Sequence, residues 1–301
     1  MVGEIISVSI YGINGSQLNA AYDVQGDSVL TAFDTLGNIV FQVTGSWEDE
    51  ISVEKYRDSA TSTAYYVIII PQTRPDGTVQ YPFVFVPNGS GGGTQSTYQM
   101  VQQYGWYMGM NGGYFDYSQS STYKPYGITI ENGTLIREYT GEYFRNNYTL
   151  TIDQYGTLGY EITQNQGLTA EDLLAENITS SLLGLVPLVI NGQAADVESQ
   201  WWTNTERAQR QIIGQYPNGD YCVVTCEGRN YDSSPGFTVS EARTLCLDMG
   251  LQFAMAVDGG GSTETVIGDH QLNKVYNGST GRIVPTYIVF NGTDQFFVPN
   301  E

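Results

Sequence analysis

The stretch FAMAVDGGGST, residues 253–263, joins a short apolar run to a carboxylate and three consecutive glycines. The run 253–257 is typical of a buried strand, so Asp258 is expected where that strand ends. Glycines lack a Cβ, so Gly259, Gly260 and Gly261 can take positive φ values and let a ligand approach the main chain. Successive N–H groups in such a turn form a concavity that binds anions. The stretch predicts a carboxylate beside an anion cradle, with a plain glycine-rich turn as the alternative.

Two nucleotide-binding motifs do not fit this stretch. A phosphate-binding loop requires a lysine after its glycines, and none follows here. A dinucleotide fingerprint opens a helix, whereas Glu264 stands at its third glycine position and residues 265–269 are typical of a strand and a turn.

The formal net charge of −20 also argues against general nucleic-acid binding, which needs a basic surface. An anionic substrate would need a local basic patch to overcome this field. Six of the 12 Lys and Arg residues lie between Arg207 and Arg282, around the glycine stretch. A bound divalent cation would offset the charge as well, but the sequence shows no dedicated loop for one, and no metal ligand is assigned.

Several other residues are interpreted as structural. Cys222, Cys226 and Cys246 do not have the spacing of a disulfide framework or a zinc site and are expected to be free, small and buried. Five Asn-Gly-Ser/Thr triplets are interpreted as turns rather than glycan sites. The sole histidine, His270, is expected in a surface hairpin turn rather than in catalysis. No apolar run is long enough to span a membrane, and the first residues lack the features of a signal peptide.

The first 58 residues are expected to form a separate, small all-β module. Residues 18–27 are echoed by residues 30–38, and each copy is typical of a strand ending in an Asp/Gly turn. This unit resembles short repeats of bacteriophage tail and fibre proteins, which implies attachment or assembly. Residues 46–64 are polar and are interpreted as a linker or surface element, and residues 65–70 and 81–86 as a strand pair.

The C-terminal third predicts a βαβ crossover within a mixed β-sheet, and residues 59–301 are expected to form one α+β domain. Residues 221–225 are typical of a buried strand, Thr238 and Glu241 form a capping box, and a helix is expected through Met249 before the strand at 253–257. A strand, a crossover helix and a strand indicate a parallel pair. Glu227, Arg229 and Asp258 should then emerge at one edge of the sheet, where open α/β sheets bind ligands.

Five motifs occur in the order and rough spacing of the phosphodiester glycosidase domain, the catalytic domain of the uncovering enzyme, N-acetylglucosamine-1-phosphodiester alpha-N-acetylglucosaminidase. They are NGGYFD (111–116), GLVPLV (184–189), RQIIG (210–214), EGR (227–229) and DGGGS (258–262), and the resemblance covers about residues 60–292. Three motifs depart from the family pattern. Its Asp-Gly-Arg begins with Glu227 here, its His-Pro-Arg-Thr is Ala208 to Gln211, and its Gly-Glu-Arg-x-Val has Gly281 in place of the glutamate.

The resemblance implies hydrolysis of a sugar-1-phosphodiester at the anomeric C–O bond. Phosphate is a good leaving group, so the main needs are a carboxylate that activates water or stabilises the oxocarbenium-like centre, and cations that hold the phosphate. The catalytic candidates are Asp258, Glu227 and Arg210. The substrate-binding candidates are Asn111, Gly112, Arg229, Gly259, Gly260, Ser262, Thr263 and Arg282. Taken singly, Glu227 and Arg229 could form a surface ion pair and Asn111 could be a turn residue.

The alternative function is a non-catalytic virion adhesin that keeps the scaffold and binds carbohydrate. Both hypotheses place the protein in a virion or outside the cell. Both also give it a cell-surface or cell-wall polysaccharide with phosphodiester links as its ligand, and other virion proteins as partners of the N-terminal module. Neither predicts a nucleic-acid partner.

Overall fold

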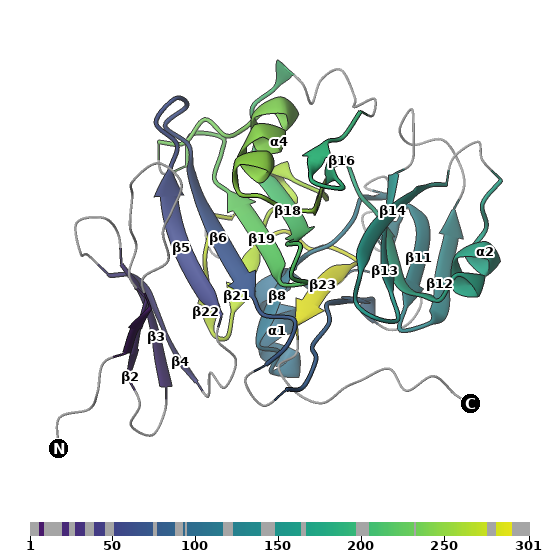
Figure 1. The fold of residues 1–301 in the computed structure, drawn as a ribbon, viewed down its shortest axis with the longest axis horizontal. Helices are drawn as coiled ribbons and strands as arrows, with labels where there is room; N and C mark the ends of the chain where they lie inside the picture. Colours follow the sequence, from purple (N-terminus) through teal and green to yellow (C-terminus); the bar gives the residue numbers. More distant parts are fainter. Residues whose placement is uncertain are drawn as a thin grey trace.

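Three β-sheets form most of the chain after residue 50 (Figure 1). The computed structural model describes residues 51–74, 77–87, 93, 95–116, 123–139, 148–163, 167–196, 205–231, 233–275 and 281–290, with the backbone of four strands before residue 51. Strands dominate and helices are few, which is compatible with the predicted β-rich α+β class. The specific arrangement of the strands differs from the expected one.

The largest sheet has seven strands in the order β17-β16-β20-β18-β19-β6-β5. Its central strands β18 and β19 are buried along their whole length. Helix α4 packs against β16 and β17. The bounds are β5 Ser52–Arg57, β6 Ala64–Ile70, β16 Val186–Ile190, β17 Gln193–Ala194, β18 Arg210–Gln215, β19 Tyr221–Cys226, β20 Phe253–Ala256 and α4 Val239–Asp248.

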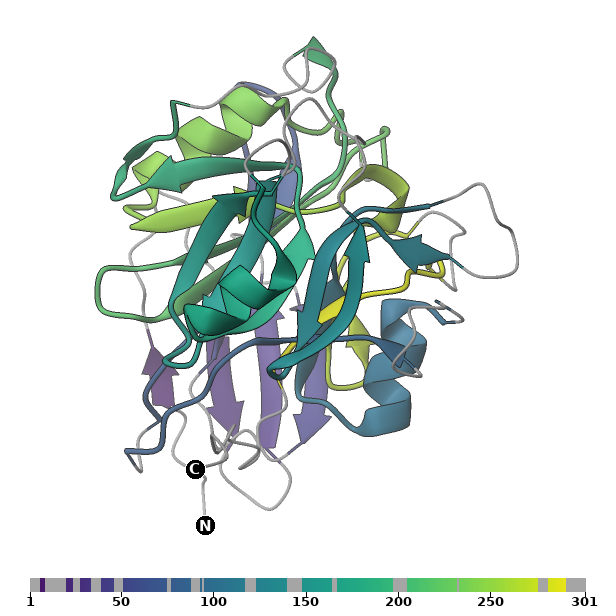
Figure 2. The same cartoon turned by 90° about the vertical axis from the view of Figure 1, so that its right-hand side faces the viewer.

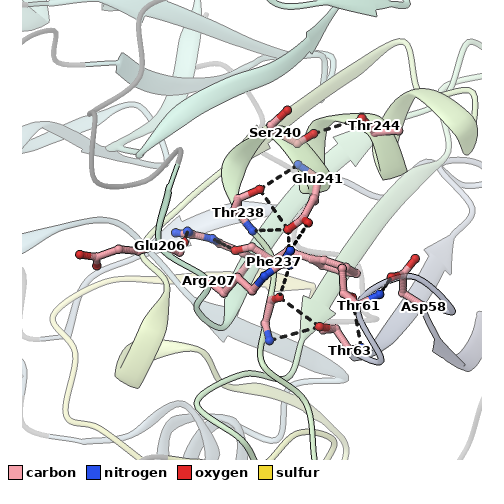
Figure 3. A network of polar contacts seen from close by, with 12 residues as sticks. Asp58, Thr61, Thr63, Glu206, Arg207, Phe237, Thr238, Ser240, Glu241 and Thr244 are labelled. Carbon is pink, nitrogen blue, oxygen red and sulfur yellow. Dashed lines mark hydrogen bonds and ion pairs between the residues drawn. The ribbon is translucent and has the colours of Figure 1, made fainter.

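Helix α4 begins where its capping box predicts. The Thr238 hydroxyl accepts a hydrogen bond from the Glu241 N–H at 3.2 Å, and the Glu241 carboxylate accepts one from the Thr238 N–H at 2.9 Å. Both terminal nitrogens of Arg207 donate to the same carboxylate (Figure 3). The start of α4 is thereby tied to the segment that leads into β18.

The expected parallel pair of β19 and β20 is wrong. Strand β18 lies between them and pairs antiparallel with both, so β19 and β20 run in the same direction without being neighbours. Every ladder among the described strands is antiparallel, so the sheet is not the mixed sheet that the crossover implied. The two carboxyl ends still lie at one edge, because the intervening strand only spaces them apart.

A second sheet has five strands in the order β22-β21-β8-β23-β7, with helix α1 packed against β8 and β21. The expected pairing of residues 65–70 with 81–86 is wrong, because β6 belongs to the large sheet and β7 pairs with β23. The bounds are β7 Phe83–Phe85, α1 Thr97–Tyr104, β8 Met108–Asn111, β21 Thr265–Ile267, β22 His270–Gln271 and β23 Tyr287–Phe290. A short 3₁₀ turn, η2 (Gly260–Ser262), lies between β20 and β21.

The third sheet has five strands in the order β12-β11-β15-β13-β14 and carries helix α2 (Figure 2). A two-stranded ladder of β9 and β10 joins it to the second sheet along the chain. The bounds are β9 Phe115–Asp116, β10 Lys124–Pro125, β11 Gly127–Glu131, β12 Thr134–Tyr139, β13 Tyr148–Asp153, β14 Leu158–Ile162, β15 Ile178–Leu183 and α2 Ala170–Ala175.

The core of these sheets is one large cluster of buried apolar side chains, with smaller clusters beneath α1 and α2. Cys222, Cys226 and Cys246 are free and buried, as predicted. Burial raises the pKa of each thiol, to about 12 for Cys222, which keeps the thiols protonated and unreactive. No helix in the described ranges is long and apolar enough to cross a membrane.

The four strands before residue 51 form an antiparallel sheet of their own, in sequential order. They are β1 Ile6–Val8, β2 Ala20–Asp23, β3 Ser28–Phe33 and β4 Ile39–Gly45. Of the two interpretations of residues 46–64, a linker or a surface element, the linker is wrong from Ser52 onward. There β5 is the edge strand of the large sheet, and Ile51 and Val53 lie in the core. The division of the chain at residue 58 stays a prediction, and this pairing favours a boundary before Ile51.

Candidate active site

The two glycine motifs meet and form one backbone unit. The Asp258 N–H donates to the Gly112 carbonyl at 3.2 Å. The Asn111 side-chain amide donates to the Asp258 carbonyl at 2.7 Å, and its oxygen accepts from the Glu264 N–H at 3.1 Å. Asn111 is fully buried and binds both ends of the glycine turn. These bonds shape the turn, which fits the alternative interpretation of Asn111 as a turn residue; its role as a substrate-binding residue stays a prediction.

The antiparallel ladders bring the predicted catalytic residues to one edge of the seven-stranded sheet. Arg210 opens β18 opposite Cys226, the last residue of β19, and Ile212 lies opposite Ala256 near the end of β20. Glu227 and Asp258 therefore leave the sheet on either side of the strand that Arg210 begins. All three side chains are almost completely buried.

Close backbone approach explains the glycines of the turn. A Cβ placed on Gly259 would lie 2.8 Å from the carbonyl oxygen of Gln209. That carbonyl accepts the Gly260 N–H at 2.9 Å, so the turn is bound to the chain that leads into β18. Gly260 has φ +58°, a value that strains other residues. The Ser262 and Thr263 N–H groups donate to the Gly259 and Gly260 carbonyls at 3.1 and 3.2 Å, so these nitrogens are used within the turn. The anion cradle stays a prediction.

Two arginines approach this turn from different loops. Nη1 of Arg282 donates to the Ser262 hydroxyl at 3.2 Å. A Cβ on Gly260 would lie 3.1 Å from Nη2 of Arg229, so that guanidinium packs against the glycine. Arg229 is exposed and Arg282 is half-buried, so both can be reached from solvent. The exposed Lys274 lies in a segment bound to the same site, and the sequence analysis missed it.

Arg210, the third catalytic candidate, is buried and donates to two main-chain carbonyls. Its Nε donates to the Phe237 carbonyl at 2.8 Å and its Nη2 to the Glu206 carbonyl at 2.9 Å. Burial lowers the pKa of this guanidinium. The charges of several neighbouring groups, of which Tyr114 has the largest effect, act in the opposite direction. These bonds tie the chain before β18 to the start of α4. We therefore assign Arg210 a supporting role behind the turn.

Glu227 also holds main chain at the site. Its Oε1 accepts the Lys274 N–H at 2.9 Å, and the Gln209 side chain donates to the Lys274 carbonyl at 2.9 Å. Asn273 donates to the Thr263 carbonyl at 2.8 Å, so the same segment is bound to the glycine turn. The placement of Glu227 favours a role in holding residues 272–275 over that of a second catalytic carboxylate.

The remaining predicted site residues also lie at the turn. His270, which was not expected to take part in catalysis, lies far from it. Ser262 and Thr263 are buried in the turn itself, and Gly112 donates its N–H to the Thr286 carbonyl. His270 is half-buried on β22 opposite Ile267, at the end of β21 that points away from the turn. Among the described residues no group of three or more His, Cys, Asp or Glu side chains could hold a metal ion.

The sequence profile of the phosphodiester glycosidase domain matches residues 104–291, more than half of the chain. The chain belongs to the phosphodiester glycosidase family. Membership in this family supports a glycosidase-type hydrolase function, and the glycine turn with its carboxylate lies within the matched region.

The chain is also similar to one curated protein and to several solved structures. The SPbeta prophage-derived uncharacterized protein YomE of Bacillus subtilis (strain 168) is 25% identical over 164 residues. That alignment covers 54% of this chain but only 25% of YomE. The catalytic domain of zebrafish N-acetylglucosamine-1-phosphodiester alpha-N-acetylglucosaminidase, auto-inhibited by its pro-peptide, matches with TM-score 0.62 and 18% identity, over 82% of this chain and 83% of that one. A hypothetical protein from Synechocystis matches with TM-score 0.61 and 10% identity, over 96% and 80% of the two chains. At these identities the structural matches establish a shared fold.

One departure from the phosphodiester glycosidase pattern has a structural counterpart in Glu264. A Cβ on Gly281, where the family motif has glutamate, would overlap the Glu264 carboxylate and lie 2.6 Å from its Cδ. The Glu264 carboxylate, which comes from a different segment of the chain, therefore occupies the space beside the residue that precedes Arg282. In the sequence, Glu264 was informative only in excluding a dinucleotide fingerprint. One sequence signal could have indicated its importance: Glu264 is a charged residue directly before a strand that its apolar pattern marks as buried.

The Glu264 carboxyl predicts a pH dependence of stability. Burial raises its pKa to about 7, against an opposing effect of the Thr97 and Tyr98 N–H groups. Below the ordinary glutamate pKa both folded and unfolded chains hold the proton, and between that value and 7 only the folded chain does. Stability is therefore lost as pH rises through this window.

The Glu264→Gln variant lacks this titrating carboxyl group. Its free energy of unfolding, relative to that of the wild type, should therefore rise between pH 5 and pH 8 by on the order of 2–3 kcal/mol. Urea unfolding of both proteins at the two pH values measures the change. The same difference at both pH values would contradict the assignment.

Proposed function

We propose that this protein hydrolyses a sugar-1-phosphodiester of the N-acetylglucosamine-1-phosphate type in a cell-surface or cell-wall glycopolymer. The observation that carries the proposal is the meeting of one carboxylate residue and two guanidinium groups at a single glycine turn. Asp258 opens the turn, Arg282 donates to Ser262 within it, and Arg229 packs on Gly260. Family membership supports glycosidase-type chemistry, and the cations favour an anionic leaving group.

The chemistry divides between the two kinds of side chain. The C1–O bond to phosphate breaks, the phosphate monoester leaves with the bond electrons, and a water oxygen forms the new bond to C1. Arg229 and Arg282 stabilise the phosphate oxygens, so a strong general acid is not needed. Asp258 supplies negative charge to the oxocarbenium-like centre and can accept the proton of the water. This role does not depend on whether the reaction retains or inverts the anomeric configuration.

Arg282→Ala should separate phosphate recognition from sugar chemistry. Loss of one charge-assisted hydrogen bond costs about 1.5–3 kcal/mol, so KM for an N-acetylglucosamine-1-phosphodiester should rise roughly tenfold to a hundredfold. A neutral aryl glycoside of the same sugar should be affected much less, because it lacks the anion. Steady-state kinetics on the two substrates measure the difference.

Arg74→Ala is the matched control, since Arg74 follows β6 at the opposite end of the large sheet. Equal losses on charged and neutral substrates would contradict the phosphate-binding role. A wild-type protein that binds the glycopolymer without any turnover would instead favour the adhesin hypothesis.

We also propose that the strands before residue 51 attach the protein to other virion proteins. The sequence repeat of phage-fibre type supports this location, and so does the similarity to YomE, which is prophage-derived. A chain that starts at Ile51 should fold and keep its hydrolytic activity, because it retains β5 and the core residues Ile51 and Val53. Circular dichroism and the phosphodiester assay test this. Aggregation of that chain, relieved by adding residues 1–50, would contradict the boundary.

A further inference from the structure

A ring of hydrogen bonds connects Glu264, the start of helix α1 and Arg282 at the glycine turn. Its backbone is fixed by Asn111, whose amide oxygen accepts the Glu264 N–H and whose N–H donates to the Glu264 carbonyl, both at 3.1 Å. Its Oε2 accepts the Thr97 N–H at 2.8 Å, in the first turn of α1. The carboxylate thus connects the glycine turn to the start of a helix 167 residues away in sequence.

The second half of the ring returns from this helix to the turn. The Gln95 carbonyl, two residues before Thr97, accepts the Val284 N–H at 3.2 Å. Two residues before Val284, Arg282 donates to the Ser262 hydroxyl. Each chain segment in the ring spans only three residues, 262–264, 95–97 and 282–284. Little slack remains, so the position of the guanidinium depends on the bond between Glu264 and Thr97.

A direct contact reinforces this dependence. The Glu264 carboxylate fills the space over the α-carbon of Gly281, the residue that precedes Arg282. Gly281 has φ +63°, so the backbone turns sharply at this point. Glu264 is 1% exposed and does not reach solvent itself. It therefore acts on a ligand only through the residues that it holds.

We infer that Glu264 is a positioning residue that holds the Arg282 guanidinium over the glycine turn for an anionic phosphate group. This inference rests on the phosphate-binding role proposed above for Arg282. A carboxylate that only caps helix α1 would stabilise the helix without affecting how the turn binds an anion. The two roles predict different phosphate affinities for a variant that loses the bond between Glu264 and Thr97.

Binding of inorganic phosphate to the full chain, measured by isothermal titration calorimetry, distinguishes them. Arg282→Ala should abolish or strongly weaken phosphate binding, and Glu264→Ala should weaken it about tenfold because the ring is open. Glu264→Gln keeps an oxygen that can accept the Thr97 N–H, and should remain within twofold of the wild type.

Ser96→Ala is the matched control for helix α1. It removes the hydroxyl that accepts the Gln99 N–H, and so weakens the same helix end while leaving the ring closed. Its phosphate affinity should equal that of the wild type. Unchanged affinity in Glu264→Ala, or an equal loss in Ser96→Ala, would overturn the inference. Absence of hydrolysis together with the expected binding pattern would count against the proposed function alone.

A double-mutant cycle tests the contact with Gly281 without any ligand. Gly281→Ala should lower the urea unfolding midpoint in the wild-type background, where the new methyl group meets the carboxylate. In the Glu264→Ala background the decrease should be smaller, because only the backbone strain remains. Equal decreases in the two backgrounds would show that Glu264 does not act on this segment.

Discussion

Asp258→Asn should reduce kcat for the phosphodiester by ~10²–10³ while the protein stays folded. The substitution keeps the shape of the side chain and the N–H that donates to Gly112, so the glycine turn should persist. What it removes is the negative charge that faces the sugar as positive charge develops at C1. The affinity for inorganic phosphate should not fall, because the cations on the turn are unchanged. Single-turnover kinetics and phosphate titration measure the two effects separately.

Asp269→Asn is the control, since it makes the same change in net charge at an exposed position beyond β21. Its kcat should match that of the wild type. Hydrolysis at the wild-type rate by Asp258→Asn would show that Asp258 only shapes the turn, and would contradict the proposed mechanism.

Asn111→Ala should lower the free energy of unfolding by about 2–5 kcal/mol, because two buried backbone groups lose their partner. These groups are the Asp258 carbonyl and the Glu264 N–H, which the Asn111 side chain binds. A buried polar group left without a hydrogen bond carries its full desolvation penalty. Urea unfolding measures the change, and activity should fall with it since the turn loses its fixed shape.

Asn218→Ala is the matched comparison, an exposed asparagine in the turn between β18 and β19. It should change the free energy of unfolding by no more than about 1 kcal/mol. A cost for Asn111→Ala as small as this would mean that the turn does not need its side chain.

The sequence predicted that Glu227 and Asp258 leave the sheet at one edge, although β19 and β20 are not the neighbouring strands that it implied. Residues 221–226 and 253–256 are strongly apolar and a capped helix joins them, so their common direction could be inferred. The strand between them could not, because apolar periodicity marks which residues are buried and carries no information on lateral pairing. Arg210 illustrates the consequence: its motif was visible, but its bonds to Phe237 and Glu206 depend on where β18 pairs.

Glu264 and Lys274 show a second limit. Glu264 is buried by α1, whose first residue lies 167 positions earlier, so its environment is set by distant sequence. Lys274 lies at the site because Glu227 and Gln209 bind its N–H and its carbonyl, contacts between segments that are distant in sequence. The capping boxes of α2 and α4, by contrast, could be predicted because each is complete within four residues.

The hydrogen bonds of Asn111 also bear on when the site can form. Its partners Asp258 and Glu264 lie 147 and 153 residues further along the chain. Contacts of such separation are entropically slow to close, and they tend to appear late in folding. During synthesis the first glycine motif has no partner until residues 258–264 have left the ribosome. In a pulse-labelled refolding experiment, amide protection of residues 258–264 should therefore appear in the slowest phase, after the hairpin of β18 and β19.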